Sequence, residues 1–144
     1  MYGQIGRAAS PDQATGNMKR GSQHDRGALI ALAQGIFYLV TGAWPLVSIR
    51  SFEAITGPKA DRWLVKTAGV LIMAIGAALT LAGSRKSVTP EMRLLAVGSA
   101  LGLTGIDIVY VARGRISKIY LLDAAAELGL VTGWALIGWR VSGR

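Results

Sequence analysis

Long apolar stretches alternate with short polar segments along most of this chain. Four stretches stand out, at 27–49, 63–83, 94–112 and 119–139. Each approaches the ~20 residues that an α-helix, rising about 1.5 Å per residue, needs to cross roughly 30 Å of hydrocarbon. A helix that packs on a soluble core keeps one polar face, whereas these stretches are apolar on nearly all sides. The pattern therefore predicts an all-α integral membrane protein, a four-helix bundle with up-down-up-down topology.

Polar residues dominate the segment before the first apolar stretch. Residues 1–26 are rich in Gly, Gln, Ser, Asp and Arg and hold too little apolar surface to fold alone. The sequence therefore predicts a disordered tail over 1–26 and a single transmembrane domain over 27–141. The first apolar stretch is too long for a secretory signal and no small-residue cleavage site follows it, so it is expected to remain as an anchor. Met18, followed by Lys19-Arg20, is a second candidate translation start.

Helix boundaries are marked by capping residues. Thr89-Pro90-Glu91 supplies an N-cap, a proline for the first helical position and an acid for the first turn. Asp61 and Ser117 are the corresponding candidate caps of the second and fourth spans. The loop at 51–56 predicts one turn of interfacial helix, with Phe52 and Ile55 dipping into lipid. Aromatic residues near both ends of the bundle are expected to anchor the spans at the membrane surface: Trp44, Trp63, Tyr110 and Tyr120 at one end, and Trp134 and Trp139 toward the other.

Charge placement decides how the net charge of +8 is interpreted. Nearly every Lys and Arg lies in a tail, in a loop or near a helix end, which is typical of headgroup anchors and argues against nucleic-acid binding. The lipid bilayer is thus the expected partner. The side of the termini carries nine basic residues, Arg7, Lys19, Arg20, Arg26, Arg85, Lys86, Arg93, Arg140 and Arg144, and the other side carries six, Arg50, Lys59, Arg62, Arg113, Arg115 and Lys118. This difference predicts that both termini are cytoplasmic.

Cysteine is absent and His24 is the only histidine. The sequence therefore offers no disulfide framework and no CxxC motif, and it predicts no metal or cofactor site and no catalytic residue that can be named.

Three acids lie inside the predicted spans. Asp107 lies about six residues before the end of the third span and Asp123 about six residues into the fourth, so both are expected roughly 9 Å inside the same end of the bundle. Glu127 is one turn deeper than Asp123 on the same helix face. Lys66 enters the second span from that end and is the only cation within reach from inside a span.

Acids within lipid are costly, on the order of 2.5–3.5 kcal/mol each at the centre of a span, so these three are expected to face the bundle interior. They would pair with Lys66 or a loop arginine, or hold a proton, and a polar stripe of Gln34, Tyr38 and Thr41 on the first helix would supply hydrogen bonds. The predicted ligand- or proton-binding site consists of all of these residues except Thr41: Asp107, Asp123, Glu127, Lys66, Gln34 and Tyr38. The alternative is structural. Lys66 would then snorkel to the headgroups, and the other polar groups would lock helix pairs.

Small residues predict close helix packing. Gly98 and Gly102 form a GxxxG motif with Gly105 one turn on, and Ala74, Ala78 and Ala82 make a stripe in the second span. Contact between helices of one chain is the expected use, with a homo-oligomer as the alternative.

The loop residues Phe52-Glu53 and Thr56-Gly57-Pro58-Lys59, the segment 61–66 and the hairpin 107–120 resemble small four-span bacterial membrane proteins of the DoxX-like groups. The resemblance covers roughly residues 28 to 140 and implies a bacterial inner (plasma) membrane protein. It carries over no catalytic residue. Three functions remain open: binding of a small ligand, a proton or a partner subunit by the three acids, a membrane enzyme acting on a lipid-soluble substrate, and a structural subunit of a membrane complex.

Overall fold

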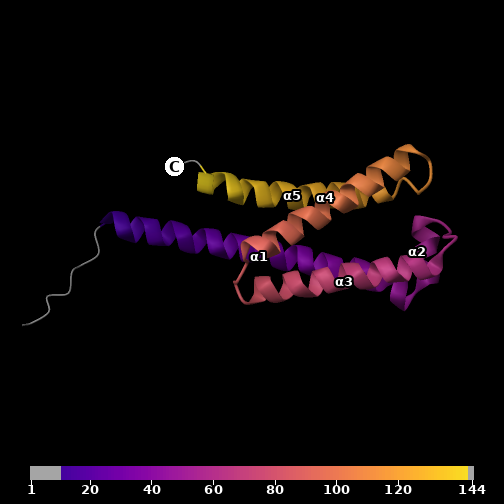
Figure 1. Cartoon of the computed structure of the whole chain (residues 1–144), viewed down its shortest axis with the longest axis horizontal. Coiled ribbons are helices and arrows are strands. Elements are labelled where there is room, and N and C mark those ends of the chain that lie inside the picture. Colours follow the sequence, from indigo (N-terminus) through magenta and orange to yellow (C-terminus); the bar gives the residue numbers. More distant parts are fainter. Residues whose placement is uncertain (1–10, 143–144) are drawn as a thin grey trace, which may run out of the picture.

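Helices make up nearly all of the described chain. The computed structural model describes the backbone of residues 11–142 and the side chains of residues 21–22 and 25–137. Within this part there are no strands, and the elements are α1 (Pro11–Val47), α2 (Ile49–Thr56), α3 (Arg62–Ser84), α4 (Pro90–Ala112) and α5 (Tyr120–Ser142) (Figure 1). Four of these helices, α1 from Asp25 onward, α3, α4 and α5, are long and apolar enough to cross a membrane. The predicted all-α fold with four candidate spans is confirmed.

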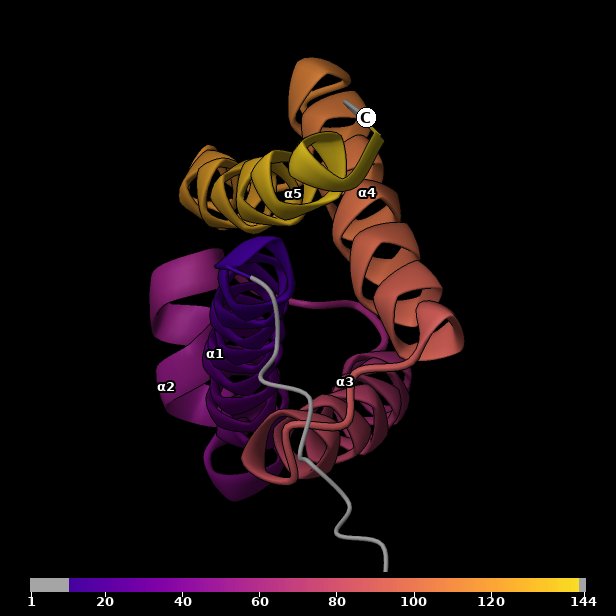
Figure 2. The same cartoon turned by 90° about the vertical axis from the view of Figure 1, so that its left-hand side faces the viewer.

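The four long helices form two antiparallel pairs. Consecutive long helices run in opposite directions along the long axis of the molecule, while the short α2 lies at one end (Figure 1). Helix α1 packs along α3, and α4 packs against α5. Seen along the bundle, the helices follow the circular order α1, α3, α4, α5, with α5 next to α1 (Figure 2). The interior is therefore bounded by one pair on each side.

The first helix is longer than the sequence predicted. It begins at Pro11, so the predicted disordered tail is wrong for residues 11–26, which are helical. Proline suits a first helical position, and each residue added to an existing helix gains a hydrogen bond without a new nucleation cost. The polar residues 11–26 thus extend a helix that the apolar residues after them already form. The part of the predicted tail at residues 1–10 lies outside the described residues.

The end of α1 is also earlier than predicted, because the chain turns at Ser48. Ser48 is extended, with φ −147° and ψ 90°, and its hydroxyl accepts a hydrogen bond from Ser51 N at 3.3 Å to cap α2. The predicted short helix is present as α2. Its Phe52 packs edge-on against Trp44, with ring centroids 5.6 Å apart. This ring therefore faces the protein, whereas the sequence predicted that it would face lipid.

The predicted caps have different outcomes. Thr89 accepts a hydrogen bond from Met92 N at 3.3 Å and Pro90 opens α4, as predicted. Asp61 holds the N-cap position of α3, but its side chain makes no capping hydrogen bond. Ser117 lies in the turn before α5, where its hydroxyl accepts from Ile119 N at 3.4 Å.

Glycines on α1 and α3 allow these two helices to pack closely. A Cβ on Gly76 would lie 2.8 Å from the carbonyl oxygen of Gly35, and one on Gly42 would lie 2.7 Å from that of Gly69. Gly83 approaches the backbone of α1 in the same way one heptad further along. Only a hydrogen in place of a side chain permits such backbone approach, so the glycines set the distance between these two helices.

The predicted GxxxG contact within the chain is wrong. A Cβ on Gly98, Gly102 or Gly105 would meet no atom within 4 Å, because these glycines face away from the other helices. Among the alanines of the predicted stripe, Ala82 is buried but Ala74 is exposed. Small residues do bring helices together in this protein, but at other positions.

Large apolar side chains cover much of the outer surface. Val47, Leu94 and Leu122 are 85%, 75% and 69% exposed. Such exposure suits helices that are surrounded by lipid, since hydrocarbon outside the bundle solvates these side chains. The buried core is small by comparison, and it holds polar as well as apolar side chains.

Candidate functional site: an acidic cavity between the helix pairs

A cavity of about 320 Å³ lies between the two helix pairs, toward the end that carries α2. We call it the acidic cavity, because Asp107 of α4 and Asp123 and Glu127 of α5 all line it. Its other walls come from α1, α2 and α3 and are mostly apolar or aromatic. They include Thr41, Trp44, Pro45, Phe52, Ile55, Val65, Gly69, Ile72, Leu103 and Tyr120. The three acids predicted from depth alone are therefore brought to one place.

Asp107 and Asp123 face each other across the α4–α5 contact. Their carboxyl groups lie close enough to interact electrostatically. Two negative charges so close together in a buried site repel each other, which favours the state in which only one of the two carboxyls is ionised. Asp107 is only 6% exposed, so neighbouring residues of the protein cover it almost completely. The match in depth arises because α4 ends and α5 begins at the same end of the bundle.

Glu127 lies deeper and is fully buried. One of its oxygens, Oε2, accepts a hydrogen bond from the Tyr38 hydroxyl at 2.9 Å. The hydroxyls of Tyr38 and Ser99 lie 3.3 Å apart, and Gln34 Nε2 donates to Tyr38 at 3.2 Å. Gln34 and Tyr38 of the predicted polar stripe therefore hold Glu127 in place through hydrogen bonds, whereas Thr41 takes no part in this network. The Thr41 hydroxyl bonds to Phe37 O of its own helix at 2.8 Å.

The network continues through Gln34, which is also fully buried. Its Nε2 donates to the carbonyl of Ala96 at 2.8 Å, and its Oε1 accepts from Trp134 Nε1 at 2.9 Å. A polar chain thus joins α1, α4 and α5 through the centre of the protein. Every described member of it below Glu127 has a hydrogen-bond partner, so this part rigidly fixes where Glu127 stands.

Two carboxyl oxygens in the cavity have no such partner. Asp107 Oδ2 and Glu127 Oε1 are buried and make no hydrogen bond to the described residues. Leaving a buried polar atom unsatisfied costs about 1–3 kcal/mol, and more if it is charged. Both atoms belong to residues that line the cavity, so an occupant of the cavity could satisfy them.

Lys66 does not join the acids. Its side chain is exposed on α3, it does not line the cavity, and the ion pairs of the described side chains are Arg62–Glu53 and Lys86–Asp25. The predicted pairing of Lys66 with the acids is therefore wrong. Depth placed Lys66 correctly along the bundle axis, but its position around α3 turns it outward. Snorkelling to the membrane surface fits this orientation.

Aromatic rings and one ammonium surround the end of the cavity near α2. Lys59 Nζ lies 4.9 Å from the ring centroid of Tyr120 and 5.9 Å from that of Phe52, and both rings line the cavity. The same ammonium donates to the carbonyl of Thr56 at 3.0 Å. This arrangement holds a cation over the faces of two cavity rings, where the ring quadrupole attracts it.

An ion pair ties α2 to the start of α3. Arg62 donates from Nε and Nη2 to the two oxygens of Glu53, at 2.9 and 2.8 Å. This bidentate pair spans the loop from residue 57 to 61, and it holds the pKa of the Glu53 carboxyl below its ordinary value. Since Phe52 beside it lines the cavity, the pair also fixes one wall of the acidic cavity.

Sequence reasoning missed Trp134 and Ser99 as parts of the site. Trp134 was predicted as an interfacial anchor, yet it is 2% exposed and hydrogen-bonded to Gln34. A signal for it was present, because residue 134 lies seven after Glu127 and so shares its helix face. Trp139, the other predicted anchor near this end, has no described side chain.

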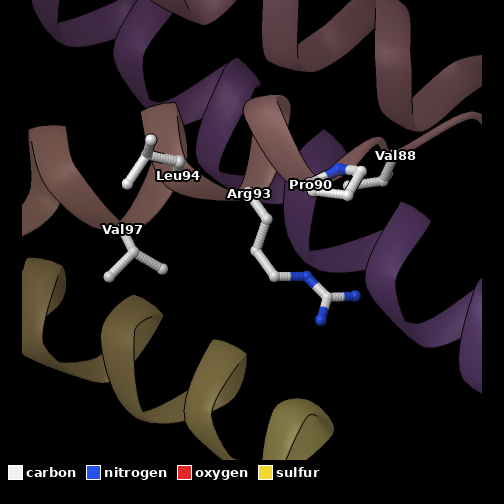
Figure 3. A pocket seen from close by; sticks show the side chains of 5 residues that line it. All are labelled: Val88, Pro90, Arg93, Leu94 and Val97. Atoms are coloured by element: carbon white, nitrogen blue, oxygen red, sulfur yellow. The ribbon is translucent and has the colours of Figure 1, made fainter.

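A second hollow, of about 360 Å³, lies at the opposite end of the protein. Its lining residues are Val88, Pro90, Arg93, Leu94 and Val97, and Arg93 extends from α4 toward α5 (Figure 3). The guanidinium carbon of Arg93 lies 5.8 Å from the ring centroid of Trp134. Arg93 is half-buried and already engaged with this ring, so the acidic cavity is the stronger candidate site.

Comparison of the chain with protein-family models, with curated proteins and with solved structures finds no match. The resemblance to the DoxX-like groups accordingly stays a prediction. What the site can do must be argued from its own geometry.

Proposed function

We propose that this protein binds a small molecule within the membrane, in the acidic cavity. The observation that carries the proposal is the pair of buried, unpartnered carboxyl oxygens, Asp107 Oδ2 and Glu127 Oε1, on residues that line a cavity of about 320 Å³. That volume lies at the lower end of the roughly 300–1,000 Å³ of small-molecule sites. Apolar walls with a few convergent polar groups are also typical of such sites.

A purely structural role explains less of this geometry. Acids that only lock helices together are expected to use both carboxyl oxygens, just as Gln34 uses both the nitrogen and the oxygen of its amide. Here Glu127 uses one oxygen and leaves the other free. A bound ligand or a proton accounts for the free oxygen, whereas helix packing does not.

A membrane enzyme is the second candidate function, and the Asp107–Asp123 pair favours it. Of two neighbouring buried carboxyls, one in its protonated form can act as a general acid toward a bound substrate. Glu127, held by Tyr38, would then serve as the base. The lipid-facing surface suits a lipid-soluble substrate, which would reach the cavity from the membrane.

The proposal includes a place in the cell. We infer an inner-membrane protein with both termini in the cytoplasm, supported by the nine-to-six excess of basic residues on that side. The acidic cavity would then open toward the outer half of the membrane. Assembly as a homo-oligomer or with a partner subunit is compatible with the exposed glycines of α4.

Filling the cavity tests the function without knowledge of the ligand. Leu103 lines the cavity, whereas Leu101 is exposed and does not, so Leu103→Trp and Leu101→Trp form a matched pair. Native mass spectrometry and thermal-shift screening of the purified protein should detect a ligand with the wild type and Leu101→Trp, but not with Leu103→Trp. Binding that Leu103→Trp leaves unchanged, or no binding in either measurement, would refute the proposal.

A further inference from the structure

We infer that the ligand of the acidic cavity is a small organic ammonium ion with an apolar body. This inference rests on the proposed function and goes further, because it names the ligand's chemistry. Four separate features of the cavity support it: its charge, its free acceptors, its aromatic rings and its apolar walls.

Charge is the first feature. Three acids line the cavity, and among the described residues no Lys, Arg or His does. Ionisation of any of these acids places a negative charge in the cavity. In a poorly hydrated site a negative charge requires a nearby positive partner, and an anionic ligand would be repelled. Lys66 was the expected partner, and it faces away.

The free acceptors are the second feature. An ionised carboxylate oxygen accepts hydrogen bonds and donates none, so a ligand that donates would satisfy Asp107 Oδ2 and Glu127 Oε1 in their ionised state. An ammonium group carries up to three N–H donors and no acceptor. Such charge-assisted hydrogen bonds are roughly twice as strong as neutral ones. An alcohol donates only one hydrogen bond and brings no charge.

The aromatic rings are the third feature. Phe52 and Tyr120 line the cavity, and the Lys59 ammonium already lies over both ring faces. The rings are therefore oriented to attract a cation.

The walls are the fourth feature. Pro45, Val65, Ile72 and Leu103 surround the space between the rings and the acids. A small hydrated metal ion would leave this apolar surface uncovered, and the described residues hold no group of three or more His, Cys, Asp or Glu arranged to bind a metal. A compact hydrocarbon body beside the ammonium would cover the walls and gain their burial energy.

The test compares ligands of one shape that differ only in charge. The probes are 2-phenylethylamine, hexylamine and cyclohexylamine, each with the alcohol of the same carbon skeleton, added to the full-length protein in nanodiscs at pH 7. Trp44 lines the cavity, so tryptophan fluorescence reports binding. We expect at least one amine to bind with a Kd roughly tenfold or more below that of its alcohol. The effect should be absent from Leu103→Trp.

Variants then locate the charge that the amine recognises. Glu127→Gln and Asp107→Asn preserve shape and should each reduce the amine's advantage over its alcohol several-fold. Asp61→Asn removes an exposed acid at the same end of the bundle and should leave the ratio unchanged. If an acid variant fails to fold, the amine-to-alcohol ratio of the wild type alone decides.

The outcomes separate the two proposals. If neutral compounds bind in a manner that Leu103→Trp abolishes, while no amine exceeds its alcohol, the cavity binds ligands but the ammonium inference is wrong. If neither the amines, the alcohols nor any screened compound binds, the proposed function itself is wrong. An amine preference that persists in both Glu127→Gln and Asp107→Asn would also overturn the inference.

Discussion

The two oxygens of Glu127 have different surroundings, and this difference gives the side chain its proposed role. Oε2 is held by the Tyr38 hydroxyl, while Oε1 is buried without a partner. Tyr38 is itself fixed by Gln34, and Gln34 by Trp134 and Ala96. The carboxyl is thereby positioned before a ligand arrives, so little side-chain freedom remains to be lost on binding.

Glu53 gives a testable pH dependence at the end of the cavity. Its folded-state pKa is lowered by the hydrogen bonds from Arg62, so the ion pair contributes stability above the unfolded pKa of about 4.3 and loses it as pH falls through the lower folded value. We therefore expect α2 to loosen below about pH 4. Hydrogen exchange of the α2 amides, compared between pH 6 and pH 3.5 after correction for intrinsic rates, measures this.

A neutral variant provides the control for that measurement. Glu53→Gln should show the loosened α2 at both pH values, because its amide cannot form the ion pair. Glu91→Gln, an acid at the other end of the bundle, should behave as the wild type. Equal protection of α2 at both pH values in the wild type would contradict the role assigned to the pair.

For single residues, the sequence predicted which acids lie together, but it did not predict which side chains form hydrogen bonds or ion pairs. Asp107, Asp123 and Glu127 were placed together by counting residues from helix ends, and this is confirmed. The rotation of α3 was not predictable, because its apolar residues surround the helix and mark no inner face. Lys66 was therefore misassigned, and the hydrogen bond of Trp134 was missed.

The element scale is governed by the contact of α1 with α3. Gly76→Ala places a Cβ where Gly35 O and Leu39 N would lie within 3 Å, so the helices must move apart. We expect destabilisation of roughly 1–3 kcal/mol, typical of overpacking. The midpoint of thermal or SDS-induced unfolding in detergent measures it.

Gly98→Ala is the matched control for Gly76→Ala. Both glycines lie within long apolar helices, but a Cβ on Gly98 meets open space, so its unfolding midpoint should not fall. Alanine also favours helix at both sites, which makes any loss at Gly76 a packing effect. Equal effects of the two substitutions would show that the α1–α3 contact does not depend on glycine.

Glycine spacing explains why one motif misled and another was overlooked. GxxxG is a short local motif, while Gly69, Gly76 and Gly83 recur every seven residues and meet positions 42, 35 and 28 of the antiparallel helix. The seven-residue spacing is visible in the sequence. Its meaning depends on which helix lies opposite, and a uniformly apolar span gives no sign of its neighbour.

At the scale of the whole molecule, orientation in the membrane is the main prediction. Both termini are expected in the cytoplasm, because basic residues are more numerous on that side. Reporter fusions at residue 144 and in the loop at 113–118 should report the cytoplasm and the opposite side, respectively. The reverse result would place the acidic cavity in the inner half of the membrane.

The number, length and order of the spans followed from hydropathy alone, since lipid demands long apolar helices. The arrangement of the helices into two pairs with a cavity between them did not. That arrangement depends on contacts between distant segments, such as Tyr38 with Glu127, and no local pattern encodes them.

The order of synthesis gives the Tyr38–Glu127 hydrogen bond a further consequence. The last span, α5, carries both Asp123 and Glu127 and is the least apolar of the four candidate spans. It leaves the ribosome when α1 is already in the bilayer, with Gln34 and Tyr38 available as partners. The first span thus offers hydrogen-bond partners to the last one during insertion, which lowers the free-energy cost of placing its acids in lipid. Biogenesis of this protein is therefore expected to be cooperative, with the first helix assisting the insertion of the last.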